Sequence, residues 1–177
     1  GFTRSNPLGT AEEQAKFNVN DEISVQADGQ DAVTYKYDGK EWQPQGDKFL
    51  KWESNEMNFT AYYPASFNGT INQPTEYTSL ESLAAADFMS FSGPQTNTNG
   101  NQLTLTMNRK MARVIVEIAG FNDQYAGATI DNVSSLSICG VKAYKHDNKF
   151  YALIKPCDAQ NSETFLSLDV AEGESKT

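Results

Sequence analysis

Alternation with a period of two residues is the feature of this chain that most restricts its fold. In residues 33–37 (VTYKY), three apolar or aromatic side chains alternate with two polar ones. This pattern is typical of a β-strand that buries one face. On the order of ten such short runs follow one another, separated by loops rich in glycine, asparagine and proline. They predict an all-β protein built from β-sandwiches, not from βαβ units.

Three segments give more specific predictions. Asp38-Gly39 separates two strand-like runs, and this dipeptide favours a type I′ hairpin turn because both central residues there need a positive φ. Residues 112–118 form the most apolar alternating run in the chain and are expected to be a central strand. Ser79 is a good N-cap for a short helix that extends to Ala86.

A change in charge along the chain indicates a domain boundary near residue 108. Residues 1–108 carry 14 acidic and 6 basic residues, whereas residues 109–177 carry 9 and 8. A clean strand pattern at residues 103–107 (LTLTM) also ends just before this point. We therefore expect a first domain at 1–108, which includes the short helix, and a second at 109–177. Because a seven-stranded sandwich usually needs about 100 residues, the second domain is expected to be small, incomplete or truncated.

The composition argues against two classes of partner. The net charge is −9 and no basic stripe offsets it, so we expect no binding to nucleic acid. No stretch approaches the ~18 consecutive apolar residues that a membrane span requires. No signal-peptide pattern follows Gly1.

The side chains that usually carry catalysis are sparse. The single histidine, His146, lies in a probable turn between charged residues, where such a side chain is normally exposed. The adjacent acids Glu12-Glu13 and Asp21-Glu22 point to opposite faces if they lie on strands, so they cannot converge on one substrate atom. We therefore expect no catalytic residues, no bound cofactor and no enzymatic activity.

The two cysteines do not form a metal-binding pattern. Cys139 and Cys157 belong to no CxxC or similar cluster, which argues against a zinc site. They pair if their strands adjoin, and otherwise remain two thiols; the sequence leaves both alternatives open.

Aromatic residues cluster in the first domain. Trp42, Trp52 and Tyr62 are compatible with a platform that binds sugars by stacking on their rings. The alternative is ordinary packing within a sandwich, where aromatic cross-strand pairs are common. The packing interpretation is favoured, and the glycan-contact interpretation stays as its rival.

Several segments, in their order along the chain, resemble the fimbrillin-like family of Bacteroidetes, which includes the subunits of type V pili. The segments that carry the resemblance span nearly the whole chain: NDEISV (20–25), the hairpin at 35–42, FTAYYP (59–64), DFM (87–89), LTLTM (103–107), MARVIV (111–116) and YALIKP (151–156). The resemblance implies a fold of two transthyretin-like β-sandwiches. It also implies export as a lipoprotein and a location at the cell surface, in fimbriae or associated with the outer membrane.

The resemblance also implies a mode of assembly. In the polymerising members of the family, a protease cuts after an arginine near the N-terminus and removes a strand. A donor strand from another subunit then fills the groove that this opens, which is a form of β-augmentation. Arg4 is the residue that matches such a processing site, and other pilus subunits are the implied partners.

Two departures from the family pattern are visible. Arg109 stands where the family usually has a histidine. The sequence ends at Thr177, whereas relatives continue through a further hairpin to a last strand. Either this chain is a short variant or its C-terminal strands are missing, and the sequence leaves both alternatives open. Our main hypothesis is a structural subunit or minor component of a bacterial surface fimbria that serves cell adhesion, with host or bacterial surface ligands. The alternative hypothesis is a surface glycan-binding module.

Overall fold

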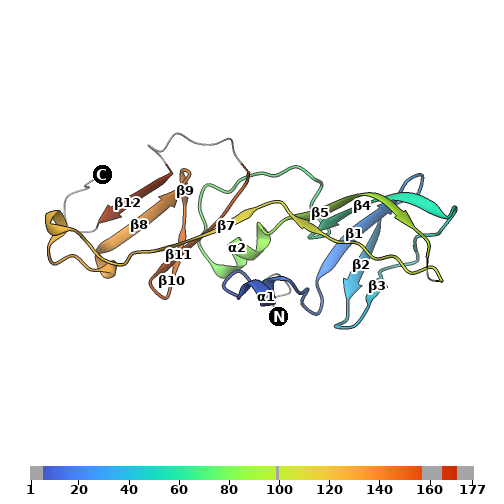
Figure 1. Ribbon diagram of the computed structural model, residues 1–177, viewed down its shortest axis with the longest axis horizontal. Coiled ribbons are helices and arrows are strands. Elements are labelled where there is room, and N and C mark those ends of the chain that lie inside the picture. Colours follow the sequence, from blue (N-terminus) through green and yellow to red (C-terminus); the bar gives the residue numbers. More distant parts are fainter. Residues whose placement is uncertain (1–5, 99, 157–164, 171–177) are drawn as a thin grey trace. The chain divides into compact units, whose positions relative to one another are not determined.

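The computed structural model describes residues 6–98, 100–156 and 165–170, and it consists mainly of antiparallel strands (Figure 1). The all-β prediction is therefore confirmed. The chain divides into two compact units, the first made of residues 1–71 and 87–110 and the second of residues 72–86 and 111–177. The last crossing between the units follows residue 110, near the expected boundary. However, residues 72–86 belong to the second unit, which neither charge nor strand pattern revealed.

The first unit contains one six-stranded sheet in the order β3-β2-β1-β4-β5-β6, with antiparallel neighbours throughout. Its strands are β1 (Glu22–Ala27), β2 (Val33–Tyr37), β3 (Trp42–Pro44), β4 (Glu56–Tyr63), β5 (Met89–Thr96) and β6 (Asn108–Arg109). Burial alternates along β4, whose residues Met57, Phe59, Ala61 and Tyr63 face the core. The inner face of the sheet is thus apolar, as the period-two pattern predicts.

The hairpin at Asp38-Gly39 is present, but its turn differs from the prediction. Tyr37 pairs with Trp42, so the loop between β2 and β3 holds four residues. Gly39 has a φ of 103°, whereas Asp38 is not among the residues with a positive φ. The Asp38 carboxylate instead accepts hydrogen bonds from the backbone N–H groups of Lys40 and Glu41, both at 2.8 Å. The side chain of Asp38 therefore stabilises a longer loop than a type I′ turn.

A buried carboxylate fixes the start of β1. Asp21 accepts a hydrogen bond from the backbone N–H of Asn18 at 2.8 Å and another from the hydroxyl of Tyr63 at 3.3 Å. Asp21 is almost fully buried, and a buried charge is tolerated only when it has such partners. The first residues of β1 are thus tied to the end of β4.

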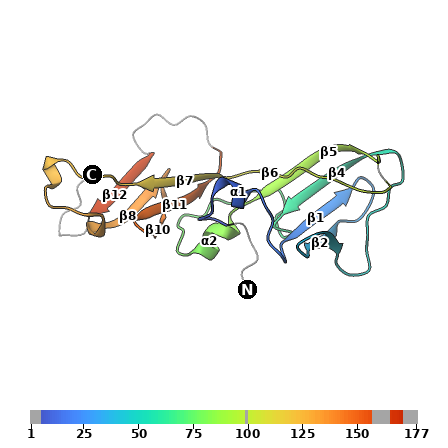
Figure 2. The ribbon, with the colours of Figure 1, turned by 60° about the horizontal axis from the view of Figure 1, so that its bottom comes forward.

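The second unit is a small sandwich of two three-stranded sheets, ordered β10-β11-β7 and β12-β8-β9 (Figures 1 and 2). Its strands are β7 (Ala112–Glu117), β8 (Val133–Ile138), β9 (Val141–Lys142), β10 (Tyr144–His146), β11 (Lys149–Ile154) and β12 (Leu166–Val170). The expectation that residues 112–118 form a central strand is wrong, because β7 pairs only with β11 among the described strands. The centre of this sheet is β11, in which the last five residues are buried.

In the described residues, two short α-helices accompany the sheets, and the second unit also has two 3-10 helices, η1 (Asp123–Tyr125) and η2 (Ile130–Asn132). The helix α2 (Leu80–Ala85) starts after Ser79, whose hydroxyl accepts a hydrogen bond from the backbone N–H of Ser82 at 3.1 Å, as expected for an N-cap. This helix lies in the second unit, not in the first as expected. The first unit has a helix that the sequence did not suggest, α1 (Ala11–Gln14), capped by Thr10.

Side chains before α2 explain why this segment belongs to the second unit. The hydroxyl of Tyr77 donates to the carbonyl oxygen of Leu153 in β11, and the side chain of Gln73 donates to the same oxygen at 3.0 Å. Gln73 also accepts from the backbone N–H of Lys155 at 2.7 Å. The backbone N–H of Tyr77 donates to the carbonyl of Lys142, the last residue of β9 in the other sheet, at 2.9 Å. The segment is therefore bonded to strands of both sheets.

The buried hydroxyl of Tyr77 predicts a loss of stability at high pH. Burial raises the pKa of Tyr77 to about 12 from 10.0. The contribution of this neutral phenol is complete below about pH 10, the pKa of an unfolded tyrosine, and is lost as the pH rises towards 12. We expect the free energy of unfolding in urea to fall more steeply over this range for the wild type than for Tyr77→Phe. Parallel curves for the two proteins would contradict this assignment.

Candidate functional site

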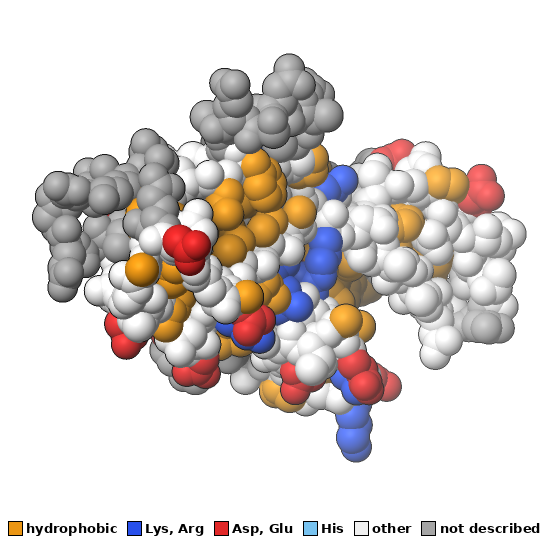
Figure 3. All heavy atoms as spheres, turned by 60° about the vertical axis from the view of Figure 1, so that its left-hand side comes forward, with side chains coloured by type: hydrophobic (Ala, Val, Ile, Leu, Met, Phe, Trp, Pro, Cys, Tyr) orange, Lys and Arg blue, Asp and Glu red, His pale blue; other side chains and the backbone are white. Residues whose placement is uncertain are grey.

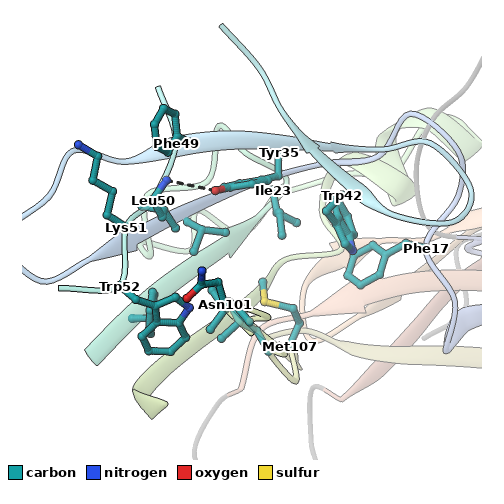
Figure 4. Close-up of a pocket in the computed structure, with 14 residues that line it drawn as sticks. Phe17, Ile23, Tyr35, Trp42, Phe49, Leu50, Lys51, Trp52, Asn101 and Met107 are labelled. Carbon is teal, nitrogen blue, oxygen red and sulfur yellow. Dashed lines mark hydrogen bonds between the residues drawn. The ribbon is translucent and has the colours of Figure 1, made fainter. Parts of the chain in front are cut away.

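An apolar groove lies over the inner face of the six-stranded sheet in the first unit (Figure 4). Its volume is about 740 Å³, and Ile23, Val25 and Phe59 of β1 and β4 form its floor. Residues from two segments outside the sheet, 49–52 and 101–107, also line it, as do Phe17, Tyr35 and Trp42. The groove therefore occupies the place where a β-sandwich normally has its second sheet.

Residues 103–107 follow a turn at Asn101 and belong to no strand in the described part of the chain. Leu103, Leu105 and Met107 line the groove, whereas Thr104 and Thr106 are exposed, so the alternation predicted for a strand is present. In the part of the chain that the structure describes, however, residues 103–107 pair with no other strand, and β6 begins only at residue 108. Alternation specifies which side chains face the core, but it does not provide a neighbour for the backbone.

Polar contacts hold the other segment in place. The side chain of Gln30 donates to the carbonyl of Lys51 at 2.7 Å and accepts from its backbone N–H at 2.9 Å. The backbone N–H of Leu50 donates to the hydroxyl of Tyr35 at 3.4 Å. Trp52 then packs edge-on against Phe59, with 5.2 Å between the ring centroids. This segment is thus fixed by Gln30, in the turn between β1 and β2, and by side chains of the sheet.

An aromatic cluster marks one end of the groove. Phe17 packs edge-on against Trp42, with ring centroids 4.9 Å apart, and against Tyr63 at 5.5 Å. Figure 4 shows Phe17 and Trp42 together at this end and Trp52 at the other. Phe17 comes from the segment between α1 and β1, outside any alternating run, so nothing in its neighbourhood signalled this position.

The sandwich of the second unit is open on one side. A single residue, Ala143, separates β9 from β10, so these edges of the two sheets adjoin. The opposite edges are β7 and β12, each of which has one partner among the described strands. Figure 2 allows both edges to be followed. The two long edge strands of this unit therefore lie on the same side of the sandwich.

Core-facing side chains on that side are not fully covered. Val116 lies opposite the buried Phe150, and Leu166 lies opposite the buried Ile138, so both face the layer between the sheets. Val114 and Val116 are nevertheless only half-buried, and Leu166 is 44% exposed. Figure 3, which brings the second unit forward, shows hydrophobic side chains gathered on its surface. Among the described residues, the open side thus combines two strands that each have a single neighbour with apolar side chains that are incompletely covered.

The sequence matches the fimbrillin-like family over residues 3–152. The chain belongs to this family. The match covers most of the chain and confirms the resemblance drawn from its ordered segments.

Two solved structures have a similar fold to this fimbrillin-like chain. A fimbrial protein from Bacteroides ovatus is 16% identical with a TM-score of 0.59, and the match covers 88% of this chain and 40% of that protein. A candidate cell adhesion protein from Bacteroides uniformis is 11% identical with a TM-score of 0.60, covering 86% of this chain and 73% of that protein. No curated protein matches the sequence. The chain therefore spans less than half of the fimbrial protein, and the likeness concerns the fold.

The residues considered for glycan contact do not form one surface. Trp42 and Trp52 of the fimbrillin-like chain both line the groove. Tyr62 lies on the opposite face of β4, where its ring packs edge-on against Phe67 at 5.5 Å. The three residues therefore do not share one platform, and glycan contact by any of them stays a prediction.

Other predicted features lie elsewhere or outside the described residues. Arg4 and Cys157 are outside them, so processing at Arg4 and pairing of Cys157 with Cys139 stay predictions. His146 ends β10, and its Nε2 atom lies 3.2 Å from an exposed carboxylate oxygen of Asp147. Within residues 6–98, 100–156 and 165–170, no three acidic, histidine or cysteine residues gather to bind a metal ion. No helix in these ranges is long and apolar enough to cross a membrane.

The contacts of Gln30 predict how the groove responds to mutation. Its two hydrogen bonds to Lys51 contribute about 1 kcal/mol each, so Gln30→Ala is expected to raise the open population of segment 49–52 about 30-fold. In a Trp42→Phe background, acrylamide should then quench the fluorescence of Trp52 more strongly. Gln45→Ala, at an exposed glutamine of the same unit, should leave the quenching unchanged. Equal quenching in all three proteins would contradict the role of Gln30.

Proposed function

We propose that this chain is a structural subunit or minor component of a bacterial surface fimbria, assembled by β-strand donation between subunits, and that it serves cell adhesion. One observation carries the proposal. In the first unit, an apolar groove of about 740 Å³ lies beside a segment, residues 103–107, that has no strand partner in the described part of the chain. Such a site offers both apolar surface and free backbone groups to a strand from another subunit.

The dimensions of the site suit a short donated strand. Residues 103–107 span about 17 Å at ~3.4 Å per residue. A strand of that length would pair with this segment and direct two or three side chains into the groove. Each fully buried apolar side chain contributes about 1.5–3 kcal/mol. Backbone pairing supplies the register, and side-chain burial supplies most of the free energy of binding.

The second unit supports the same mode of assembly. The open side between β7 and β12 leaves Val114, Val116 and Leu166 incompletely buried, and among the described strands β7 pairs only with β11. A strand added to β7 would extend its sheet to four strands and cover these side chains.

The remaining parts of the proposal follow from the family. Other pilus subunits are the partners, Arg4 is the processing site, and the protein acts at the cell surface, in fimbriae or associated with the outer membrane through a lipid. The work of the protein would be mechanical and adhesive, without a catalysed reaction. Backbone pairing and apolar burial, which the structure offers at two places, are the interactions that such a role needs.

Mutations along residues 103–107 test strand donation at the groove. We expect the processed full-length protein to form ladders that resist SDS, and Leu105→Asp to abolish them because it places a charge in the groove. Thr104→Asp introduces the same charge at the exposed neighbouring position and should leave the ladders intact. The proposal fails if the wild type stays monomeric at high concentration, or if both variants assemble equally well.

The second unit can be tested by a matched pair on β7. Val116→Lys is expected to shorten the ladders, since it puts an ammonium group between the sheets, where burying it is costly. Glu117→Lys is the matched control, because it places the same group at the next residue, whose side chain is exposed. The ion pair that it removes, with Lys149 at 3.6 Å, is exposed too, so the ladders should keep their length. Circular dichroism would show whether both variants are folded. Ladders of equal length from the two folded variants would exclude β7 as a strand-binding edge.

A further inference from the structure

The end of the groove near Trp42 is closed by a residue that does not belong to the sheet. Phe17 lines the groove and contacts the rings of Trp42 and Tyr63. Only Ala15 and Lys16 separate Phe17 from Gln14, the last residue of α1. An edge-to-face aromatic contact is worth about 0.5–1.5 kcal/mol beyond its buried area. This end of the groove therefore depends on where the segment that contains Phe17 is held.

An arginine holds that segment. One nitrogen of the Arg109 guanidinium pairs with the carboxylate of Asp87, and the other donates to the backbone carbonyl of Gln14, the last residue of α1. The carbonyls at the end of a helix lack partners within the helix, and a cation stabilises them there. Arg109 thus joins the end of α1 to β6, 95 residues further along the chain.

The carboxylate of Asp87 depends on this arginine. Asp87 is 3% exposed, and within the described residues its second oxygen, Oδ1, is buried without a hydrogen-bond partner. Removing one member of a buried ion pair leaves the other charge uncompensated, which is costly. The pair of Asp87 and Arg109 therefore stays together and keeps the guanidinium in position for the carbonyl of Gln14.

The chain after Phe17 is fastened independently of α1. Asn18 donates to Asp21, and the backbone N–H of Asn20 donates to the carbonyl of Tyr37 at 2.7 Å. The helix itself has no buried residue, and its capping bonds between Thr10 and Glu13 are internal. The segment up to Phe17 is therefore able to move without disrupting the pairing of β1 with β2.

We infer that Phe17 is a displaceable stop at the end of the groove, held in place by Arg109 and Asp87 through the carbonyl of Gln14. The inference rests on the proposed strand donation and adds how that site is regulated. A donated strand that extends as far as Trp42 has to replace Phe17 with an apolar side chain of its own. The stability of the contact at Gln14 then sets how readily a full-length strand enters the groove.

The first experiment uses the monomeric protein with no partner present. In a Trp52→Phe background, Trp42 is the only remaining tryptophan. Arg109→Gln is expected to speed tryptic cleavage after Lys16 several-fold, detected by the mass of the released fragment, and to increase acrylamide quenching of Trp42. Lys36→Gln is the matched control, because it removes an exposed ion pair with Glu22 in the same unit. Its cleavage and quenching should equal those of the starting protein.

A second pair of variants separates the stop from the contact that holds it. Phe17→Ala should increase the quenching of Trp42 although Arg109 is unchanged, and Phe17→Leu, which keeps an apolar side chain, should restore it. Thermal unfolding followed by circular dichroism shows that each variant is folded. Cleavage at Lys16 at the starting rate in Arg109→Gln, or unchanged quenching in Phe17→Ala, would overturn the inference.

Assembly then distinguishes this inference from the proposed function. If Phe17 is a stop, SDS-resistant ladders should form several-fold faster with Phe17→Ala than with the wild type. Ladders that form at the same rate would overturn the inference while leaving strand donation intact. Absence of ladders from every variant, with the monomer measurements as expected, would overturn strand donation and leave the contact between Arg109 and Gln14 established.

Discussion

The structure of the first unit depends on burying the inner face of its six-stranded sheet. β1 and β4 pair at the centre, with Val25 opposite Ala61 and Ala27 opposite Phe59. Such a face is stable only when a second layer excludes water from it. Here that layer consists of Phe17 and of two segments, residues 49–52 and 101–107, that have no strand pairing in the described residues, and it leaves a groove of about 740 Å³. The folded unit therefore keeps apolar groove surface whose burial by a further segment would be favourable.

Polar contacts between residues distant in sequence shape the second layer. Gln30 binds the backbone of Lys51 across 21 residues, and Arg109 binds the carbonyl of Gln14 across 95. These hydrogen bonds hold the second layer at separate points, whereas a second sheet would hold it by a continuous series of backbone hydrogen bonds. A layer held at separate points keeps the groove formed while leaving the backbone of residues 103–107 without a strand partner among the described residues. This combination suits an acceptor that has to be folded before its partner arrives.

The sequence predicted individual strands and helix caps better than it predicted how the strands are arranged in the sheets. The alternation in β4 and the cap at Ser79 depend on neighbouring residues, so they are readable from short segments. Alternation does not say which strands are neighbours, and for this reason residues 112–118 were expected at the centre of a sheet although β7 lies at an edge. The positions of Phe17 and Arg109 arise from tertiary contacts and had no local signal. Composition placed Trp42 and Trp52 in one cluster with Tyr62, but the strand period of two puts Tyr62 on the other face of its sheet.

The lengths of the free edges explain why assembly would be specific. An exposed edge strand pairs indiscriminately unless it is short or interrupted. In the described part of the first unit, the sheet ends at β3, which has three residues and ends in Pro44, and at β6, which has two. In the second unit, β9 and β10 are equally short, whereas β7 and β12 have six and five residues. Among the described residues, β7 and β12 are thus the long strands with a neighbour on one side only, and residues 103–107 have no strand neighbour. Each of these segments lies beside apolar side chains that are incompletely covered. Under the proposed strand donation, a partner strand would bury apolar side chains at these places, and this burial favours pairing there over pairing at the short edges.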